Sequence, residues 1–169
     1  MKKKIFFTAV FFLLIISCYG QQSKTWDKLT WLIGQWEGIG NGQPGQGGGT
    51  FSFAFDLDKK IMVRKSHSEY PAVRNKPQII HEDLMIIYMD NNENPNRAIY
   101  FDNEGHIINY RITCKEKSIE MTSEKVPDSP FFRLTYTLLN HDSVFTKFEM
   151  SADGEKYKTY IEGKSKKIK

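Results

Sequence analysis

The chain has 169 residues, of which 26% are charged and 40% are hydrophobic, and its formal net charge is +4. That length suits one domain with a sizeable core. Much of the positive charge lies in the first few residues and in the tail Lys164 to Lys169, and no basic stripe interleaved with aromatic residues lies between them. We therefore exclude nucleic acid as a partner and expect the tail to be a solvated end.

Residues 1–20 have the pattern of a secretory signal peptide. Lysines at positions 2–4 precede an apolar run that is too short to be a stable membrane anchor. Two cleavage sites compete: Gly20 suits an ordinary signal peptidase, whereas the segment ending at Cys18 resembles a bacterial lipoprotein signal whose cysteine becomes the lipidated first residue. We expect export to a bacterial periplasm, to the cell envelope or to the medium, with membrane contact only through a lipid on Cys18. Residues 21–169 would then form a single domain.

One short helix should open that domain. Apolar residues, among them Trp26, Leu29 and Leu32, recur at helical spacing between Lys24 and Ile33, and Gly34 ends the pattern.

The stretch Gly38 to Gly49 holds seven glycines and one proline. Such a run is too flexible for a core strand, so we expect a bent edge or a loop. It lacks the lysine and the following helix of a phosphate-binding loop.

The rest of the domain alternates strand patterns with turn signals. Phe51, Phe53 and Phe55 alternate with small or polar residues, as in a strand with one buried face. The stretch Gln78 to Thr113 predicts three strands separated by two polar turns. Ten strands are expected in all, near 34–38, 50–58 and 61–70, three within 78–113, and then 118–126, 131–140, 143–151 and 157–163.

Short strands joined to their sequence neighbours predict an all-β fold. We expect a ten-stranded antiparallel up-and-down barrel with one short N-terminal helix, closed so that no edge is left over. The domain has a single cysteine, Cys114, so it must hold together without an internal disulfide.

A family resemblance rests on several segments. Gly34-Gln35-Trp36 after a short helix resembles the Gly-x-Trp motif that opens the first strand of lipocalins. Together with Leu32 to Gly42, the strand beginning Ile80-His81-Glu82, and Ala98 to Gly105, the chain resembles the nitrobindins, which are ten-stranded haem-binding barrels akin to fatty-acid-binding proteins. The resemblance covers nearly all of Leu29 to Gly163.

The resemblance implies a pocket. His81 and Met150 match cavity positions of those proteins, and Asp102 falls where they have a glutamine. Tyr160 stands where they place the histidine that ligates haem iron. A phenolate can ligate ferric haem, so one expectation is haem b held by Tyr160. The other is an iron-free pocket for a small apolar ligand, in which Tyr160 only lines the wall.

Strand spacing gives a separate prediction for the pocket face. If Asp90 lies opposite Arg97, Ile87 lies opposite Tyr100, and His81, Tyr100 and Asp102 share one face. Continuing through the hairpin at 103–106 adds three further residues to this face: Ile107, Asn109 and Arg111. Met150 and Tyr160 share a face only if the turn at 153–154 has an odd number of residues, for instance through a bulge.

The opposite face of these strands is the more apolar one. It carries Ile80, Leu84, Ile86, Tyr88, Ile99, Phe101, Ile108, Tyr110 and Ile112. Burial alone would turn this face inward. We expect instead that the face with His81 lines a semi-polar cavity and that the apolar face packs outside on the helix or on a second copy, which would give a homodimer.

We expect an exported protein that binds a small apolar molecule. The alternatives are a haem-dependent enzyme or scavenger that uses His81 and Tyr160, and a structural envelope lipoprotein with a filled core. An enzyme would use His81 as a general base oriented by Asp102, but no nucleophile elbow or carboxylate pair accompanies them, so no catalytic residue is assigned. Arg64, Arg111 and Arg133 could receive a ligand carboxylate.

Overall fold

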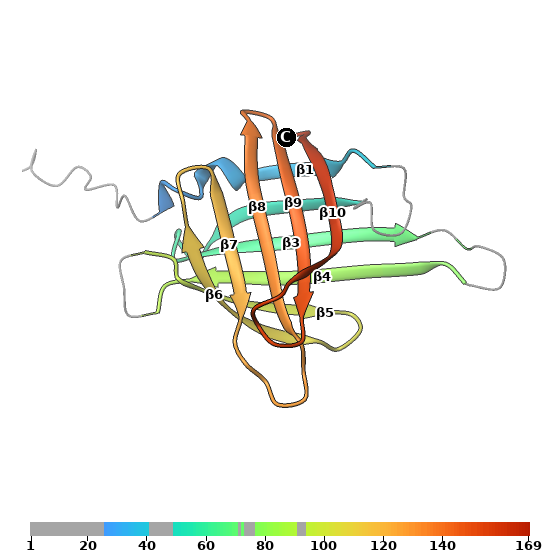
Figure 1. Ribbon diagram of the computed structural model, residues 1–169. Helices are drawn as coiled ribbons and strands as arrows, with labels where there is room; N and C mark the ends of the chain where they lie inside the picture. Colours follow the sequence, from blue (N-terminus) through green and yellow to red (C-terminus); the bar gives the residue numbers. More distant parts are fainter. Residues whose placement is uncertain (1–25, 41–48, 71, 73–76, 91–93) are drawn as a thin grey trace, which may run out of the picture.

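The structure is a computed structural model that describes residues 26–40, 49–70, 72, 77–90 and 94–169. Within these ranges, ten antiparallel strands form a closed barrel in the order β1-β10-β9-β8-β7-β6-β5-β4-β3-β2 (Figure 1). The strands are β1 Gly34–Gly38, β2 Thr50–Asp56, β3 Ile61–Tyr70, β4 Ile79–Tyr88, β5 Arg97–Asp102, β6 Ile107–Cys114, β7 Ser118–Ser123, β8 Phe131–Asn140, β9 Ser143–Ser151 and β10 Lys158–Lys167. The predicted all-β, ten-stranded barrel is confirmed.

The predicted N-terminal helix takes a tighter form. Backbone bonds run from Leu29 N to Trp26 O and from Leu32 N to Leu29 O, with separations of 2.8 and 3.0 Å. These bonds span three residues, so the segment is a series of turns ending in the 3-10 helix η3, Thr30–Leu32, rather than an α-helix. No helix among the described residues is long and apolar enough to cross a membrane.

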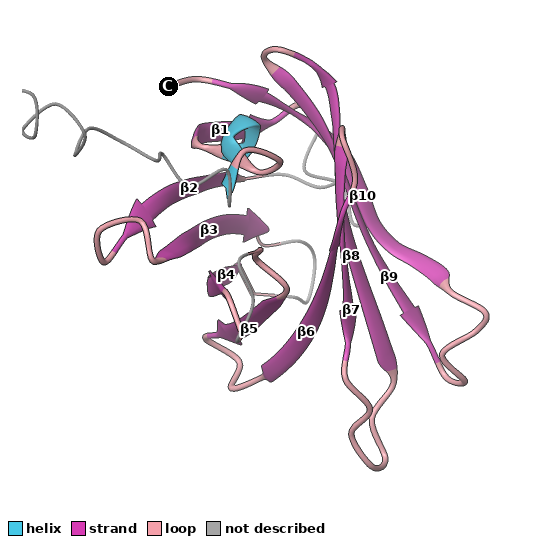
Figure 2. Ribbon diagram, turned by 90° about the vertical axis from the view of Figure 1, so that its left-hand side faces the viewer, coloured by secondary structure: helices cyan, strands magenta, loops and turns pink. Residues whose placement is uncertain are grey.

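This segment fills one end of the barrel, which we call the sealed end. Leu29 and Leu32 are fully buried in the same apolar cluster as Met62 of β3 and Ile87 of β4. The Trp26 indole nitrogen donates to the Lys59 carbonyl in the β2–β3 turn, 2.8 Å away. Figure 2 shows the helix beside β1 and β2, facing the wall made by β6 to β10. The opposite end, where β3 and β5 finish, is the open end.

The register of β4 and β5 sets which side chains point inward. Met85 lies opposite Tyr100 and Ile87 lies opposite Ala98, so the predicted register was wrong by two residues. A shift of two keeps each side chain on its face. His81, Tyr100 and Asp102 therefore do share one face, and it is the inner one.

The β5–β6 hairpin reverses the prediction of which β6 side chains face into the barrel. Phe101 lies opposite Ile107, and Asp102 N donates to His106 O at 3.3 Å, which leaves a three-residue loop in which Gly105 has a φ of 92°. The prediction assumed a loop of even length. Three apolar residues of the predicted outer set therefore turn inward: Ile108, Tyr110 and Ile112.

The predicted solvated tail is part of the barrel wall. β10 runs to Lys167, and its last residues pair with β1, with Trp36 opposite Lys167 and Gly38 opposite Ser165. Ser165 is 6% exposed, and Lys167 Nζ lies 5.1 Å from the centroid of the buried Trp36 ring. The tail was mispredicted because only Lys164 and Lys166 face outward, whereas Ser165 and Lys167 share the face of the buried Trp36.

Candidate functional site

His81, Tyr100 and Asp102 meet at the open end of the barrel. His81 Nε2 lies 3.1 Å from the Tyr100 hydroxyl, and His81 Nδ1 lies 3.1 Å from Glu104 Oε1. The Tyr100 hydroxyl also lies 3.3 Å from Asp102 Oδ2, which can accept its hydrogen. Tyr100 has one hydrogen and two neighbours able to accept it, so its donor bond can point either to His81 or to Asp102.

Electrostatics keeps Tyr100 protonated and Asp102 ionised. Burial raises the pKa of Tyr100 far above its ordinary value, and the carboxylates of Asp83 and Asp102 act in the same direction. Burial also opposes the charge on Asp102, but hydrogen bonds from the His106 backbone and ring, each 2.8 Å long, outweigh it and lower the pKa of Asp102. The pair therefore offers a hydroxyl donor beside a fixed negative charge.

A buried ion pair lies deeper in the barrel. Arg64 of β3 and Asp83 of β4 form a salt bridge, with side chains 10% and 6% exposed. Tyr136 and Thr146 are cross-strand partners on the inner faces of β8 and β9. Three buried polar atoms have no hydrogen-bond partner among the described residues: Arg64 Nε, Tyr136 Oη and Thr146 Oγ1. Such atoms normally bond to protein or to water, so the barrel centre has hydrogen-bonding capacity that these residues leave unused.

An aromatic wall lies on β8, β9 and β10. Phe132 and Phe148 stack with their ring centroids 5.8 Å apart, and Met150 lies opposite Phe132 in the register. Tyr160 occupies the bulge between Thr159 and Ile161, and its ring meets Phe148 edge-on at 6.3 Å. Met150 lies opposite Lys158, two residues before Tyr160, so the connection between β9 and β10 rather than the bulge sets this alignment. Tyr160 is nevertheless 63% exposed, so it stands at the rim.

Tyr70 also stands near this site. It is the last residue of β3, at the open end. Burial raises the pKa of Tyr70, and the Tyr160 phenol and the Glu104 carboxylate raise it further. The Tyr70 hydroxyl is therefore within electrostatic reach of both walls.

Arg111 does not belong to this site. The hairpin register turns it outward, where its side chain is 73% exposed and its Nη2 lies 3.3 Å from Glu124 Oε1. Arg133 also faces out and bonds Glu149 at 2.7 Å. Of the three arginines expected to receive a carboxylate, only Arg64 points inward.

The outward-facing His67 lies opposite Glu82. Its ring nitrogens lie 3.0 Å from Glu69 and 3.2 Å from Glu82, and these two bonds raise the pKa of His67. The described residues include no group of three side chains placed to hold a metal ion.

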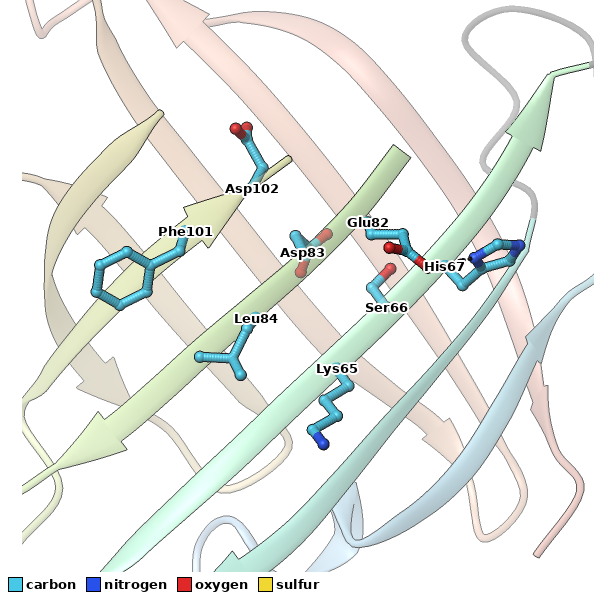
Figure 3. Close-up of a pocket in the computed structure, with 8 residues that line it drawn as sticks. All are labelled: Lys65, Ser66, His67, Glu82, Asp83, Leu84, Phe101 and Asp102. Atoms are coloured by element: carbon cyan, nitrogen blue, oxygen red, sulfur yellow. Dashed lines mark hydrogen bonds and ion pairs between the residues drawn. The ribbon is translucent and has the colours of Figure 1, made fainter. Parts of the chain in front are cut away.

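Two open hollows mark the surface. One, of about 430 Å³, crosses β3, β4 and β5 between the side chains shown in Figure 3. The other, of about 580 Å³, lies between the loop before β8 and the turn after β9. Among the six predicted pocket residues, Asp102 alone lines either of these two hollows.

Sequence reasoning missed Asp83, Tyr70, Tyr136 and Thr146 as residues of the barrel interior. A signal for Asp83 was present, because it is in phase with His81 and Met85 on a strand whose side chains alternate. Tyr136 carries no such signal, since an aromatic residue on an inner face is ordinary core.

Comparisons with known proteins support the fold. No protein-family model matches the chain, and no curated protein matches it. Fourteen chains of solved structures do match. One is the crystal structure of Rv2717c from M. tuberculosis, with a TM-score of 0.54 and 14% sequence identity, covering 86% of this chain and 98% of that chain. At this identity the likeness shows a shared barrel fold alone.

Proposed function

We propose that the barrel binds a small, largely apolar molecule that enters at its open end. The carrying observation is the contrast between the two ends. Inner side chains at the sealed end, such as Met62 and Ile87, are fully buried, whereas Phe132, Phe148 and His81 at the open end are only partly buried. Apolar side chains left partly uncovered inside a concave wall are typical of a ligand site.

The charges of the interior favour an uncharged ligand with one hydrogen-bonding group. Asp83 already compensates Arg64, and Asp102 and Glu104 add negative charge near the mouth. A carboxylate entering there would meet like charges, which favours a neutral head group. The Tyr136 hydroxyl, which lies beside Arg64, and the Thr146 hydroxyl can serve a carbonyl or hydroxyl oxygen.

Haem is the specific ligand that the nitrobindin resemblance suggests, and the surroundings of Tyr160 do not suit it as an iron ligand. A phenolate needs a nearby donor or positive charge to be stable. Tyr160 makes a ring contact with Phe148 and lies within electrostatic reach of the Tyr70 hydroxyl, and none of the cation–π contacts among the described residues involves it. The nearest inner imidazole, His81, has both nitrogens engaged. We therefore place an iron-free pocket first.

The signal-like start of the sequence supports export as part of this proposal. A carrier in the envelope would present its open end to molecules outside the cytoplasm. Mass spectrometry of the mature N-terminus would distinguish a chain that begins at Gln21 from a lipidated chain that begins at Cys18.

Binding of a neutral, environment-sensitive dye such as Nile red tests the pocket. Phe148→Ala should weaken dye binding about tenfold, because a ring at the mouth contributes on the order of 1–2 kcal/mol. Phe145→Ala is the matched control, since Phe145 lies on the same strand but faces out. Equal effects of the two changes, or no dye binding, would favour a structural envelope protein.

Addition of haem to the same protein tests the second candidate, a haem-binding barrel in which Tyr160 ligates the iron. A Soret band that Tyr160→Phe abolishes would establish ligation by Tyr160 and overturn the iron-free pocket. Solvent extraction of the purified protein, followed by mass spectrometry, would identify a ligand carried through purification.

A further inference from the structure

Four polar side chains at the open end are joined by hydrogen bonds, and we call them the mouth cluster: His81, Tyr100, Asp102 and Glu104. The His81 side chain is 25% exposed and Tyr100 is only partly buried, whereas Tyr136 at the barrel centre is fully buried. A molecule that enters at the open end therefore meets the mouth cluster first.

The hydrogens of His81 can be assigned from its neighbours. Glu104 Oε1 lies 3.1 Å from His81 Nδ1, and a carboxylate only accepts, so Nδ1 carries a hydrogen. Asp83 Oδ2 lies 3.7 Å from His81 Nε2, which is beyond hydrogen-bond distance. In the neutral ring Nε2 is therefore the bare nitrogen, and it accepts the hydrogen of the Tyr100 hydroxyl across 3.1 Å.

Protonation of His81 leaves the same kind of capacity over. Both ring nitrogens then donate, so Tyr100 turns its hydrogen to Asp102 Oδ2, 3.3 Å away. Asp102 Oδ1 already accepts from the backbone N–H groups of Glu104 and His106, at 3.0 and 2.8 Å. In both states the side-chain hydrogens of the mouth cluster are held within it, and a lone pair on the Tyr100 oxygen stays free. The mouth cluster can accept a further hydrogen bond but has none to give.

We propose that the mouth cluster selects a ligand with a neutral hydrogen-bond donor, an alcohol or a phenol, over a ketone of the same shape. This inference rests on the proposed function, which places an uncharged, largely apolar molecule at this end. The ligand hydroxyl donates to Tyr100, and its apolar part lies against the partly buried rings of Phe132 and Phe148. A carbonyl oxygen beside Tyr100 meets only acceptors and loses the hydrogen bonds that it made with water.

Other hydroxyl groups near the open end do not offset this preference. Ser66 lies opposite Asp83 in the register, and Tyr70 and Tyr160 stand at the rim. A hydroxyl can donate or accept, so these three residues serve an alcohol and a ketone alike. The preference comes from the mouth cluster alone.

Displacement of Nile red by menthol and by menthone tests the proposal, because the two molecules share a carbon skeleton and differ in a hydroxyl against a carbonyl. Menthol should displace the dye from the native chain at a concentration at least about tenfold lower than menthone. If the dye binds and menthol does not outcompete menthone, this proposal is overturned while the proposed function stands. If the dye does not bind, both are overturned.

A double substitution tests the hydrogen assignment. His81→Phe leaves Asp102 to hold the Tyr100 hydrogen, and Asp102→Asn leaves His81 to hold it. Only the double variant frees that hydrogen for a carbonyl, so the menthol preference should fall to about threefold or less, well beyond the combined effect of the single changes. Additive effects of the two changes overturn the assignment.

The matched control carries the same two substitutions in the β8–β9 turn, His141→Phe with Asp142→Asn, where the His141 side chain is 91% exposed. This control should keep the preference for menthol, and circular dichroism of each variant confirms its fold. Loss of the preference in Tyr136→Phe, with the mouth double variant unaffected, would put the ligand hydroxyl at the barrel centre and overturn the proposal. The comparison on the native chain decides the proposal even if the double variant does not fold.

Discussion

Asp83→Asn should destabilise the barrel by about 3–5 kcal/mol, the range for leaving a buried charge without its partner. The side chains of Arg64 and Asp83 are only 10% and 6% exposed, so the range for surface ion pairs, about 0–1 kcal/mol, does not apply. Asparagine keeps the shape of the aspartate and removes its charge. The Arg64 guanidinium would then remain charged among Met62, Met85 and Tyr136 with no carboxylate beside it.

Urea unfolding at pH 7, followed by tryptophan fluorescence, measures this loss. With an m-value of about 2 kcal/mol/M, the midpoint should fall by about 1.5–2.5 M. Arg111→Ala, which breaks the exposed contact to Glu124, is the control and should cost less than about 0.5 kcal/mol. A loss below about 1 kcal/mol for Asp83→Asn would mean that water reaches the ion pair and that the barrel centre is not dry.

Other consequences concern the sealed end and the β9–β10 turn. Leu32→Ala should cost about 2–5 kcal/mol in urea unfolding, because Leu32 is fully buried, and a cost near that of Ile39→Ala, at a site 63% exposed, would contradict its role as a plug. Backbone bonds from Lys156 and Glu155, with the Ser151 hydroxyl, lower the pKa of Asp153 to about 2, which a carboxyl NMR titration would measure. A depressed pKa means that the ionised Asp153 stabilises the fold at pH values above the ordinary aspartate pKa, and that this stabilisation is lost as the pH falls through about 2. The difference in unfolding free energy between the native chain and Asp153→Asn should therefore shrink as the pH falls over that interval. A difference that stays constant with pH would show that these bonds do not act through the charge.

Alternation of apolar residues was sufficient to predict the barrel and its strand count. It could not decide which face of each strand points into the barrel, because that depends on the length of the preceding turn. The loop around Gly105 has three residues instead of four, and that one residue moved Arg111 out of the site and Ile108 into the core. Local sequence signals leave such a difference open, because both loop lengths accept the same residues.

The other errors have similar causes. Trp26, Leu29 and Leu32 recur every three residues, a spacing that an α-helix and a 3-10 helix both satisfy on one face. Only the backbone bonds distinguish them. The candidate site was predicted as single residues on one face, and His81, Tyr100 and Asp102 do lie together. The buried Arg64–Asp83 pair went unrecognised as a pair because its two members lie 19 positions apart.

The seam between β1 and β10 constrains the order of assembly. The first strand of the sheet bonds to the last, with Trp36 beside Lys167 and Gln35 N donating to the carbonyl of Lys169. A chain that emerges from a ribosome or a translocation channel does so from its N-terminus, so the first strand waits with one side unpaired until the final residues arrive. Removing only the last six residues would leave an open barrel in which β1 and β10 are unpaired edge strands, and such edges promote aggregation.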